Sequence, residues 1–415
     1  MRVLVVGAGG REHALVWKLA QSARLTRLFA TPGNPGMAQH AELLESSGSV
    51  QGLTALAVSH EIDLVVVGPE QPLVDGLVDS LREAGIMAFG PHRAAARLEG
   101  SKAFAKDFML RHGVPTAASA TFSAEADALA WLASQAEPPV VKKSGLAAGK
   151  GVTVAGSMEE AGAAIRAVFA EPDTEGLVLE ERLQGRELSL IGITDGSNWL
   201  PLLLAQDYKY FGEGDRGPMT GGMGAVAPAV LLTEEQQAEV DAHIVSRTLA
   251  GLRADNLEFA GVLFIGLMVT DQGVKVLEYN TRFGDPETQS VLPLLQTDLL
   301  EVIVAACEGE LAGRSLAWRD GVAAGVVMAA PGYPGTPERG IALQPAQANE
   351  SLLVFQAGTA VRDGTLVSSG GRVLNVVGLG ETMQEALRNA YRGVAETGFA
   401  GGVWRSDIGF NLTDT

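Results

Sequence analysis

The first hundred residues alternate short apolar strands, glycine-containing turns and helical stretches, and this alternation constrains the fold most strongly. Val3–Val6 is a continuously apolar strand followed by a glycine-rich turn. Ile62–Val67 and Ile86–Phe89 repeat the pattern, and each ends at a Gly-Pro pair. Buried strands that alternate with helices favour parallel pairing, so residues 1–98 are expected to form a small doubly wound parallel sheet that binds ligands at its carboxyl edge.

The length of the chain and its hydrophobic content indicate a multidomain globular protein. At 415 residues the chain is too long for one ordinary core, and roughly two to four domains are expected. The longest apolar run, Phe259–Val269, falls well short of the roughly 20 residues that span a bilayer. The N-terminus has too short an apolar core for a signal peptide. The single cysteine, Cys307, excludes an internal disulfide and is expected to be buried. A cytoplasmic protein without a membrane segment is therefore expected.

The net charge and the residue types exclude several functions. A net charge of −18 argues against a nucleic-acid partner, although a few lysines and a metal ion are enough to hold a nucleotide. The six histidines are scattered and give no spacing suited to zinc. The chain also has no G-x-S-x-G nucleophile motif.

The turn after the first strand reads GAGGRE and leads into a helix, whose N-terminus can face an anion. A dinucleotide site would need glycine where the chain has Glu12, so an oxidoreductase is disfavoured. A small substrate that bears a phosphate fits better, with Gly9, Gly10 and Arg11 around it. Glu70, at the end of another strand, is equally consistent with a substrate contact and with a cap or loop carboxylate.

A second glycine-rich stretch, KKSGLAAGKG from Lys142 to Gly151, joins two predicted strands. It is not a P-loop, because its glycines have the wrong spacing and Gly151 follows Lys150 where serine or threonine is required. The stretch is equally consistent with a flap over phosphates and with an ordinary mobile hairpin. Lys142 shares a strand face with Val140, so it should point into the packed side of the sheet and needs an anionic partner.

Other stretches carry features of a nucleotide site. Lys102 stands in the first turn of a helix capped by Ser101, against the helix-dipole preference, which suggests a functional role. The turn between Glu180 and Glu187 exposes backbone groups that can bind an adenine edge, and Glu187 can accept from ribose hydroxyls. Residues 205–224 are expected to lack regular structure, which is typical of an active-site loop.

The stretch VKVLEYNTRFGDPETQ, residues 274–289, concentrates the most polar chemistry. It begins as a strand that pairs with Gly261–Thr270 in a hairpin. Strand periodicity places Glu278 and Asn280 on one face, about 7 Å apart along the strand, where both can bind Mg²⁺. Arg282 can neutralise a transferring phosphoryl group, and the acids that follow can receive an amine. The alternative is a strand end followed by a solvated loop.

Taken together, several blocks resemble the glycinamide ribonucleotide synthetases, also called phosphoribosylamine–glycine ligases, which belong to the ATP-grasp ligases. The blocks, in order, are GAGGREHAL at 7–15, VGPE at 67–70, LEGSKAFAKDF at 98–108, GLAAGKGV at 145–152, GPMTGGMGA at 217–225 and NTRFGDPETQ at 280–289. The resemblance spans nearly the whole chain, and the order of the blocks makes it specific.

The resemblance implies a multidomain α/β and α+β protein. We expect an N-terminal doubly wound domain at 1–100, a central ATP-grasp domain at 101–325 with a flap subdomain at about 119–190, and a small α+β domain at 326–415. The implied activity is the ADP-forming ligation of glycine to 5-phosphoribosylamine through glycyl phosphate, in de novo purine biosynthesis. Mg²⁺ or Mn²⁺ would assist, and the partners would be small molecules only, with no nucleic acid and no membrane. The chain is expected to be a monomer.

The resemblance also assigns roles to residues of this chain. Arg282, Lys142 and Asp285 would be catalytic, and Glu278 and Asn280 would bind the metal. The ATP contacts would be Lys102, Lys142, Gly149, Lys150, Gly151, Glu180, Leu183 and Glu187. The contacts with glycine and phosphoribosylamine would be Gly9, Gly10, Arg11, Glu70, Asp207, Asp285 and Thr288.

The chain departs from the family pattern at three places. Lys143-Ser144 stands where the family usually has Ala-Asp, and Met219 replaces an asparagine. Many ATP-grasp enzymes carry an acidic metal ligand on the strand before Glu278, yet Gly261–Thr270 has no acid, which leaves a further metal ligand unassigned. A carboxylating ATP-grasp ligase would share the ATP residues but should lack the GDPETQ run. A nucleotide sensor without catalysis should lose Arg282 or the Glu278/Asn280 pair.

Overall fold

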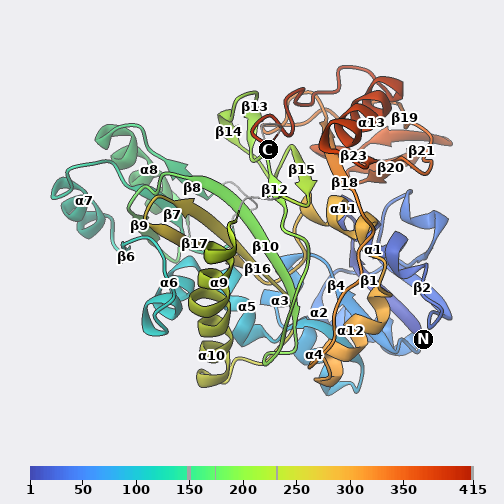
Figure 1. The fold of residues 1–415 in the computed structure, drawn as a ribbon, viewed down its shortest axis with the longest axis horizontal. Coiled ribbons are helices and arrows are strands. Elements are labelled where there is room, and N and C mark those ends of the chain that lie inside the picture. The colour runs from blue at the N-terminus through green and yellow to red at the C-terminus, as the bar shows by residue number, and fades with distance from the viewer. Residues whose placement is uncertain (147–150, 173, 230–231, 413–415) are drawn as a thin grey trace.

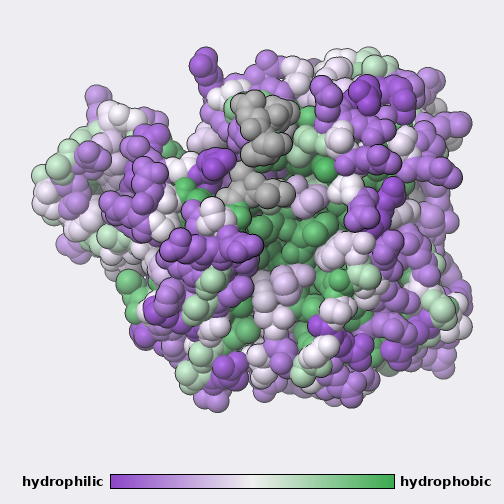
Figure 2. Space-filling view, in the orientation of Figure 1, coloured by the Kyte–Doolittle hydropathy of each residue, from purple (hydrophilic) through white to green (hydrophobic). Residues whose placement is uncertain are grey.

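The computed structural model describes residues 1–146, 151–172, 174–229 and 232–412 (Figure 1). Gly149 and Lys150, predicted to contact ATP, lie outside the described residues. No helix in these ranges is long and apolar enough to cross a membrane. In Figure 2, hydrophobic residues gather in the middle of the face shown, and hydrophilic residues cover its outer parts.

The N-terminal residues form the predicted parallel sheet. Its strands run in the order β3-β2-β1-β4-β5. They are β1 Arg2–Gly7, β2 Arg27–Pro32, β3 Glu42–Leu43, β4 Leu64–Val67 and β5 Met87–Pro91. Val3 and Val5 face one buried cluster while Leu4 and Val6 face another, as the alternation of a strand covered on both faces requires. The expectation of a doubly wound sheet is confirmed, but β2 was missed.

The helices of this part cover both faces of the sheet. They are α1 Gly10–Leu19, α2 Val50–Ser59, α3 Glu70–Val74, α4 Leu77–Glu83 and α5 Arg93–Gly100, with a 3₁₀ turn at Met37–Gln39. Gly76 adopts φ +90° and separates α3 from α4.

The parallel sheet continues directly into the central sheet. Gly90 and Pro91 of β5 pair antiparallel with Ala260 and Phe259. The central strands are β10 Arg186–Thr194, β11 Trp199–Pro201, β16 Phe259–Thr270 and β17 Gly273–Asn280. The predicted hairpin of β16 and β17 is confirmed. One continuous hydrogen-bonded sheet therefore fixes the N-terminal turns relative to the strand that carries Glu278.

Helices pack beside the central sheet. They are α6 Lys102–Arg111, α9 Glu234–Glu239, a π-helix Val240–Val245 and α10 Ser246–Ala254. Ser101 caps α6 as predicted, because its side chain accepts from the Phe104 N–H. Further along come α11 Glu287–Val291, a 3₁₀ turn Leu292–Leu294 and α12 Leu299–Glu308, which is capped by Asp298. Cys307 on α12 is only partly buried, and its Sγ donates to the Ala88 carbonyl.

A small sheet projects from the body, at the left of Figure 1. Its strands, β6 Ser119–Phe122, β7 Val140–Lys143, β8 Val152–Val154 and β9 Leu177–Glu180, run in the order β6-β9-β7-β8. Helices α7 Glu125–Ala133 and α8 Met158–Ala170 cover one face and enclose a separate core. The glycine-rich stretch after Lys142 joins β7 to β8, as predicted.

The expectation that residues 205–224 lack regular structure is wrong. The segment contains β12 Gln206–Asp207, β13 Tyr210–Gly212 and β14 Arg216–Met219, and β15 Gly224–Ala227 ends it. These strands are very short and rich in glycine, so sequence alternation gives little signal. β13 and β14 form a hairpin that pairs with no other strand among the described residues.

The last ninety residues form a sheet covered by one helix. The sheet has the order β12-β15-β18-β23-β20, so two of its strands come from the central part of the chain. The elements are β18 Val322–Ala329, β19 Leu343–Gln344, β20 Leu352–Gln356, β21 Thr359–Arg362, β22 Thr365–Ser368, β23 Arg372–Gly380, α13 Met383–Glu396 and β24 Gly398–Phe399. Glycines at 378 and 393 let α13 lie close to this sheet, since a Cβ at either would overlap a neighbour.

Candidate active site

A cavity of about 870 Å³ lies where these parts of the chain meet. Its walls come from the N-terminal turns, α5 and α6, the projecting sheet, the β13–β14 hairpin, β17 and the turn after it. Arg372 and Asn411 add a contribution from the C-terminal part. Residues from distant parts of the sequence therefore share one concave site, the usual position of a small-molecule site.

The cavity brings together most of the residues singled out in the sequence. Those that line it are Gly9, Arg11, Glu70, Lys102, Lys142, Gly151, Glu180, Leu183, Glu187, Asp207, Glu278, Asn280, Arg282 and Asp285. Gly10 and Thr288 are not among the lining residues. The Thr288 hydroxyl donates to the Gly284 carbonyl at 2.6 Å, and a Cβ on Gly10 would lie 2.7 Å from the Gln289 amide nitrogen. Both residues therefore contact the segment that follows β17 without lining the cavity themselves.

Arg282 is held against the cavity by acids on two helices. Its Nη2 lies 3.0 Å from Oε1 of Glu99, a buried residue of α5, and its Nε lies 3.6 Å from Oε2 of Glu70. Glu99 also accepts from the Thr281 N–H at 2.8 Å, which fixes the chain next to Arg282. The Arg282 Nε is buried and has no hydrogen-bond partner among the described residues. The guanidinium therefore contributes a fixed positive charge to the lining of the cavity.

A group of carboxylates surrounds Lys209 in the same cavity. Asp207, Glu187 and Glu278 act on it electrostatically, Glu287 acts on Asp207, and the Lys209 Nζ donates to Glu187 at 2.9 Å. Burial raises the pKa of Asp207 to about 7. The attraction of Lys209 opposes this shift, and the repulsion of the neighbouring acids adds to it. The negative charge in this wall therefore exceeds what Lys209 neutralises.

This excess of carboxylates fits a divalent cation. Burial alone would raise the pKa of Glu278, but Lys209, Lys102 and Lys142 hold it below its ordinary value, so Glu278 is an ionised oxygen donor. Asn280 offers an amide oxygen two residues along β17. Within the described residues, no three histidine, cysteine or acidic side chains converge into a complete metal cage. Mg²⁺ commonly keeps waters and substrate phosphates among its ligands, so a partial set of protein donors is suitable for it.

The strand β16 offers no acid to this site. Gly266 pairs with Glu278 across the β16–β17 ladder, and a Cβ at that position would lie 3.3 Å from the Glu278 Cγ. The other carboxylates of this group are on β10, β12 and α11, namely Glu187, Asp207 and Glu287. The Glu287 Oε1 already accepts from the Ser189 hydroxyl at 3.0 Å.

Lys142 has the anionic partner that its position on β7 requires. Its Nζ lies 3.1 Å from Oε2 of Glu180 and donates to the Leu277 carbonyl at 3.0 Å. The other oxygen of Glu180 lies 3.3 Å from Nζ of Lys106, and all three side chains are buried. Two lysines thus share one carboxylate, which leaves a net positive charge beside the cavity.

We expect nucleotide binding to weaken as the pH rises through the pKa of Lys106. Burial lowers this pKa to about 8, against the attraction of Glu180, so Lys106 is cationic at pH 7 and mostly neutral at pH 9. The loss of one charge beside the phosphates should reduce ATP affinity about fivefold between these values. Isothermal titration with Mg²⁺ at both pH values measures the change. In Lys106→Gln, affinity should be weaker at pH 7 and should not fall further between pH 7 and pH 9, since Asp207, with its pKa of about 7, only gains negative charge for Mg²⁺ over that range. An unchanged fall with pH would contradict the assignment.

At the N-terminal end of the cavity, Glu12 fills the glycine turn. Its Oε2 accepts from the Gly9 N–H at 2.7 Å, and its Oε1 lies 2.5 Å from the Arg11 Nε. A Cβ on Gly68 would overlap the Glu12 carboxylate, so glycine is required there. The Arg11 Nη1 donates to the Phe283 carbonyl at 3.1 Å and thereby joins this turn to the segment after β17.

Asp285 lies between this turn and the C-terminal sheet. Its Oδ2 is 2.9 Å from the Arg372 Nη2, and its Oδ1 accepts from the Gln289 amide at 2.8 Å. Burial would raise the pKa of Asp285, but Arg372 and Arg11 keep it low, so this carboxylate is ionised and suited to an ammonium group. A second cavity, of about 460 Å³, adjoins here and shares Gly9, Asp285 and Arg372 with the first.

Sequence reasoning missed four charged residues of this site. Lys106 had a signal, because it follows Lys102 by four residues on the same helix face. Glu99 stands inside the quoted block LEGSKAFAKDF, but its partner Arg282 is far away in the sequence. Lys209 lies in the segment 205–224, which the sequence predicted to be an irregular active-site loop. Arg372 enters the site only through the packing of the C-terminal sheet, which no local pattern reveals.

Comparisons with known proteins agree with the resemblance seen in the sequence. Family models for the phosphoribosylglycinamide synthetase N domain, ATP-grasp (A) domain and C domain match residues 1–99, 100–288 and 323–411. A phosphoribosylamine–glycine ligase of Mesorhizobium japonicum is 48% identical, with 99% of this chain and 98% of that protein covered. The Gallus gallus trifunctional purine biosynthetic protein adenosine-3 is 46% identical, and the match covers 99% of this chain and 42% of that longer protein.

Solved structures agree with the sequence comparison. The crystal structure of a phosphoribosylamine–glycine ligase from Thermotoga maritima superposes with a TM-score of 0.87 at 34% identity, covering 98% of this chain and 100% of that one. A biotin carboxylase domain from Hydrogenobacter thermophilus, bound to MgADP and bicarbonate, gives a TM-score of 0.74 at 17% identity and covers 97% of this chain and 91% of that one. At that identity the likeness concerns the fold alone.

Proposed function

The chain belongs to the phosphoribosylglycinamide synthetase family, and we propose the residue roles by which its cavity joins glycine to 5-phosphoribosylamine. The enzyme is an ATP-dependent ligase of purine biosynthesis, the reaction for which its relatives are named. A free carboxylate is a poor electrophile. The γ-phosphoryl group of ATP is therefore transferred to a glycine carboxylate oxygen, and the amine of phosphoribosylamine then attacks the carbonyl carbon. Phosphate leaves and the amine loses a proton, which gives glycinamide ribonucleotide.

The observation that carries the proposed roles is the buried guanidinium of Arg282, which lines the same cavity as a cluster of carboxylates. Arg282 neutralises charge on the phosphoryl group during transfer, because Glu99 and Glu70 hold its guanidinium against the cavity. Glu278 and Asn280 hold a Mg²⁺ or Mn²⁺ ion, with Asp207 beside them. A metal ion bound there would neutralise negative charge on the nucleotide phosphates.

We assign the nucleotide to the side of the cavity formed by the projecting sheet. Lys102 and Lys142 bind phosphates there, and Leu146 and Gly151 line the same cavity. Glu180, Leu183 and Glu187 line the adenosine part of the same side. Closure of the projecting sheet would exclude water, which protects an acyl phosphate from hydrolysis.

We assign glycine and phosphoribosylamine to the side formed by the N-terminal turns and Asp285. The Asp285 carboxylate receives an ammonium group, because its low pKa keeps it ionised. Gly9, Arg11 and Glu70 face phosphoribosylamine, and the second cavity extends this side toward the C-terminal sheet. Gly10 and Thr288 act through the shape of the wall, since neither lines the cavity. We further propose that the enzyme acts as a cytoplasmic monomer, with domains at 1–100, 101–325 and 326–415.

The glycyl phosphate step is tested by oxygen labelling. Glycine labelled with ¹⁸O in its carboxylate should transfer one labelled oxygen to the phosphate that is released, because that oxygen bridges carbon and phosphorus in the intermediate. A matched reaction with unlabelled glycine in ¹⁸O-water should give unlabelled phosphate. Label entering from water instead of from glycine would show simple ATP hydrolysis and would contradict the proposal.

A further inference from the structure

The β13–β14 hairpin is a wall of the cavity that lacks support from any larger sheet. Tyr210, Asp215 and Met219 of this hairpin line the cavity, and β13 pairs only with β14 within the described chain. An isolated two-stranded hairpin is at best marginally stable in water. The position of this wall must therefore be set by contacts outside its own strands.

Phe211 of the hairpin contacts Tyr333, and the hydrogen bonds and ion pairs come from residues 405–411, which we call the C-terminal clamp. Arg405 is 1% exposed, and its Nη1 donates to the Tyr210 carbonyl at 3.2 Å and to the Asp215 Oδ1 at 2.7 Å. Its Nε and Nη2 bind both oxygens of Asp407 at 2.7 and 2.8 Å. The Asp407 Oδ2 also accepts from the Gly214 N–H at 2.7 Å. One buried guanidinium and one carboxylate thus hold both ends of the hairpin turn.

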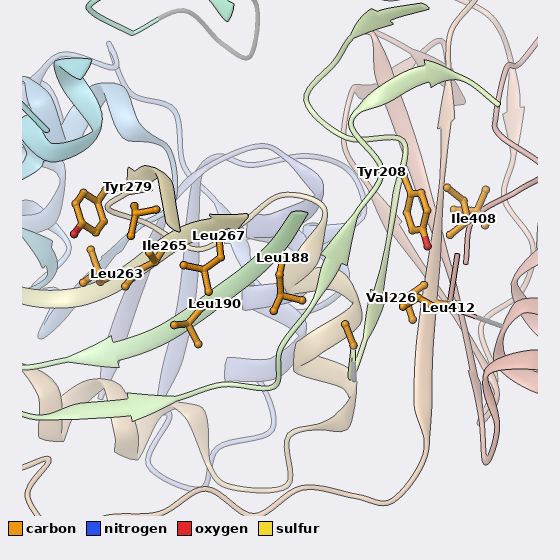
Figure 3. Packing of buried hydrophobic residues seen from close by; sticks show 14 of the residues in the cluster. Leu188, Leu190, Tyr208, Val226, Leu263, Ile265, Leu267, Tyr279, Ile408 and Leu412 are labelled. Carbon is orange, nitrogen blue, oxygen red and sulfur yellow. The ribbon is translucent and has the colours of Figure 1, made fainter. Parts of the chain in front are cut away.

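The base of the hairpin is held by the last residue of the clamp. The Asn411 Oδ1 accepts from the Gln206 amide at 2.9 Å and from the Tyr208 hydroxyl at 2.8 Å, and Asn411 itself lines the cavity. The Arg405 guanidinium lies 5.2 Å from the centre of the Tyr208 ring. Tyr208 and Ile408 belong to one buried cluster (Figure 3), so the clamp is packed onto this segment as well as hydrogen-bonded to it.

We propose that the C-terminal clamp positions the β13–β14 hairpin against the nucleotide side of the cavity, with Arg405 as its positioning residue. Tyr210 is near enough to Glu187 and Arg182 to interact with both electrostatically, and all of them line the cavity. Arg405 itself does not touch substrate; it affects the adenosine part of the site through the position of the hairpin. This inference rests on the proposed placement of ATP.

The full-length chain provides the test. In Arg405→Met, ATP affinity measured by titration calorimetry with Mg²⁺ should fall about tenfold, because charge-assisted hydrogen bonds to the hairpin are lost. Amide hydrogen exchange over residues 210–219 should accelerate by a similar factor. The KM for phosphoribosylamine should change by less than about twofold, since that substrate occupies the other side. Arg405→Lys should recover part of the ATP affinity.

Two further variants keep the test decisive. Asp407→Asn weakens the clamp without removing the buried arginine, so it should give a smaller loss of ATP affinity and faster hairpin exchange even if Arg405→Met does not fold. Arg314→Met, which removes an exposed arginine paired with Glu310 at 3.8 Å, is the control and should resemble wild type. A folded Arg405→Met or Asp407→Asn with wild-type hairpin exchange and ATP affinity would overturn the inference.

Loss of the ligase reaction in wild type would instead refute the proposed function, because exchange and ATP binding do not depend on turnover.

Discussion

Replacing Arg282 by methionine is expected to lower kcat about a thousandfold or more, the scale on which a charge-neutralising arginine accelerates phosphoryl transfer. ATP affinity should change much less, because the lysines on the other side of the cavity remain. The physical reason is the position of the Arg282 guanidinium, which lines the cavity and is held there by Glu99 and Glu70. Steady-state ADP release and ATP titration, measured on the same preparation, separate the two effects.

The control for this prediction must account for Glu99. Without Arg282, the buried Glu99 carboxylate would keep only the weaker attraction of Arg11, and burial already raises its pKa, so it would take up a proton or destabilise the fold. The double variant Arg282→Met/Glu99→Gln removes both charges and should fold with a melting temperature near that of wild type. If this folded double variant kept more than a tenth of the wild-type kcat, the role of Arg282 in the transfer step would be wrong.

The second large effect is expected at Glu278. Changing Glu278 to glutamine keeps its size but removes an ionised oxygen donor, so the activity at 1 mM Mg²⁺ should fall by roughly two to three orders of magnitude. Much higher Mg²⁺ should recover part of it, because the remaining oxygen donors bind the ion weakly. A titration of ligase activity against Mg²⁺ concentration measures the shift.

Glu310→Gln, an exposed change on the surface, is the matched control for Glu278→Gln. Its Mg²⁺ requirement should equal that of wild type. A Glu278→Gln enzyme with a normal Mg²⁺ requirement would show that the ion is held elsewhere, most directly by Asp207 and Glu287, the other carboxylates of that wall.

The sequence predicted those parts of the fold whose signal is local. Val3–Val6 and its glycine turn indicate a parallel sheet because continuous apolar strands alternating with helices have few other solutions. The alternation in Val274–Tyr279 gave the hairpin and the shared face of Glu278 and Asn280. Lys142 was correctly expected to need an anionic partner, because a lysine on a packed strand face is costly without one.

The parts that the sequence did not reveal depend on contacts between distant segments. Glu99 becomes a site residue only when α5 lies against the turn that carries Arg282. The strands β12 and β15 form because the C-terminal sheet offers them a partner in β18, so their short, glycine-rich sequences carry little propensity of their own. Arg405 stands in a terminal stretch without periodicity, and its importance is visible only from its buried partners.

The measurement that tests the central claim most directly is ADP release with Mg²⁺ and ATP, with each of the other substrates present or omitted. We expect rapid ADP formation only when glycine and freshly generated phosphoribosylamine are both present, with glycinamide ribonucleotide formed in equal amount. Bicarbonate in place of glycine should not support the reaction. ADP formation that proceeds equally well with bicarbonate, or without phosphoribosylamine, would contradict the assignment of this cavity to the ligation of glycine.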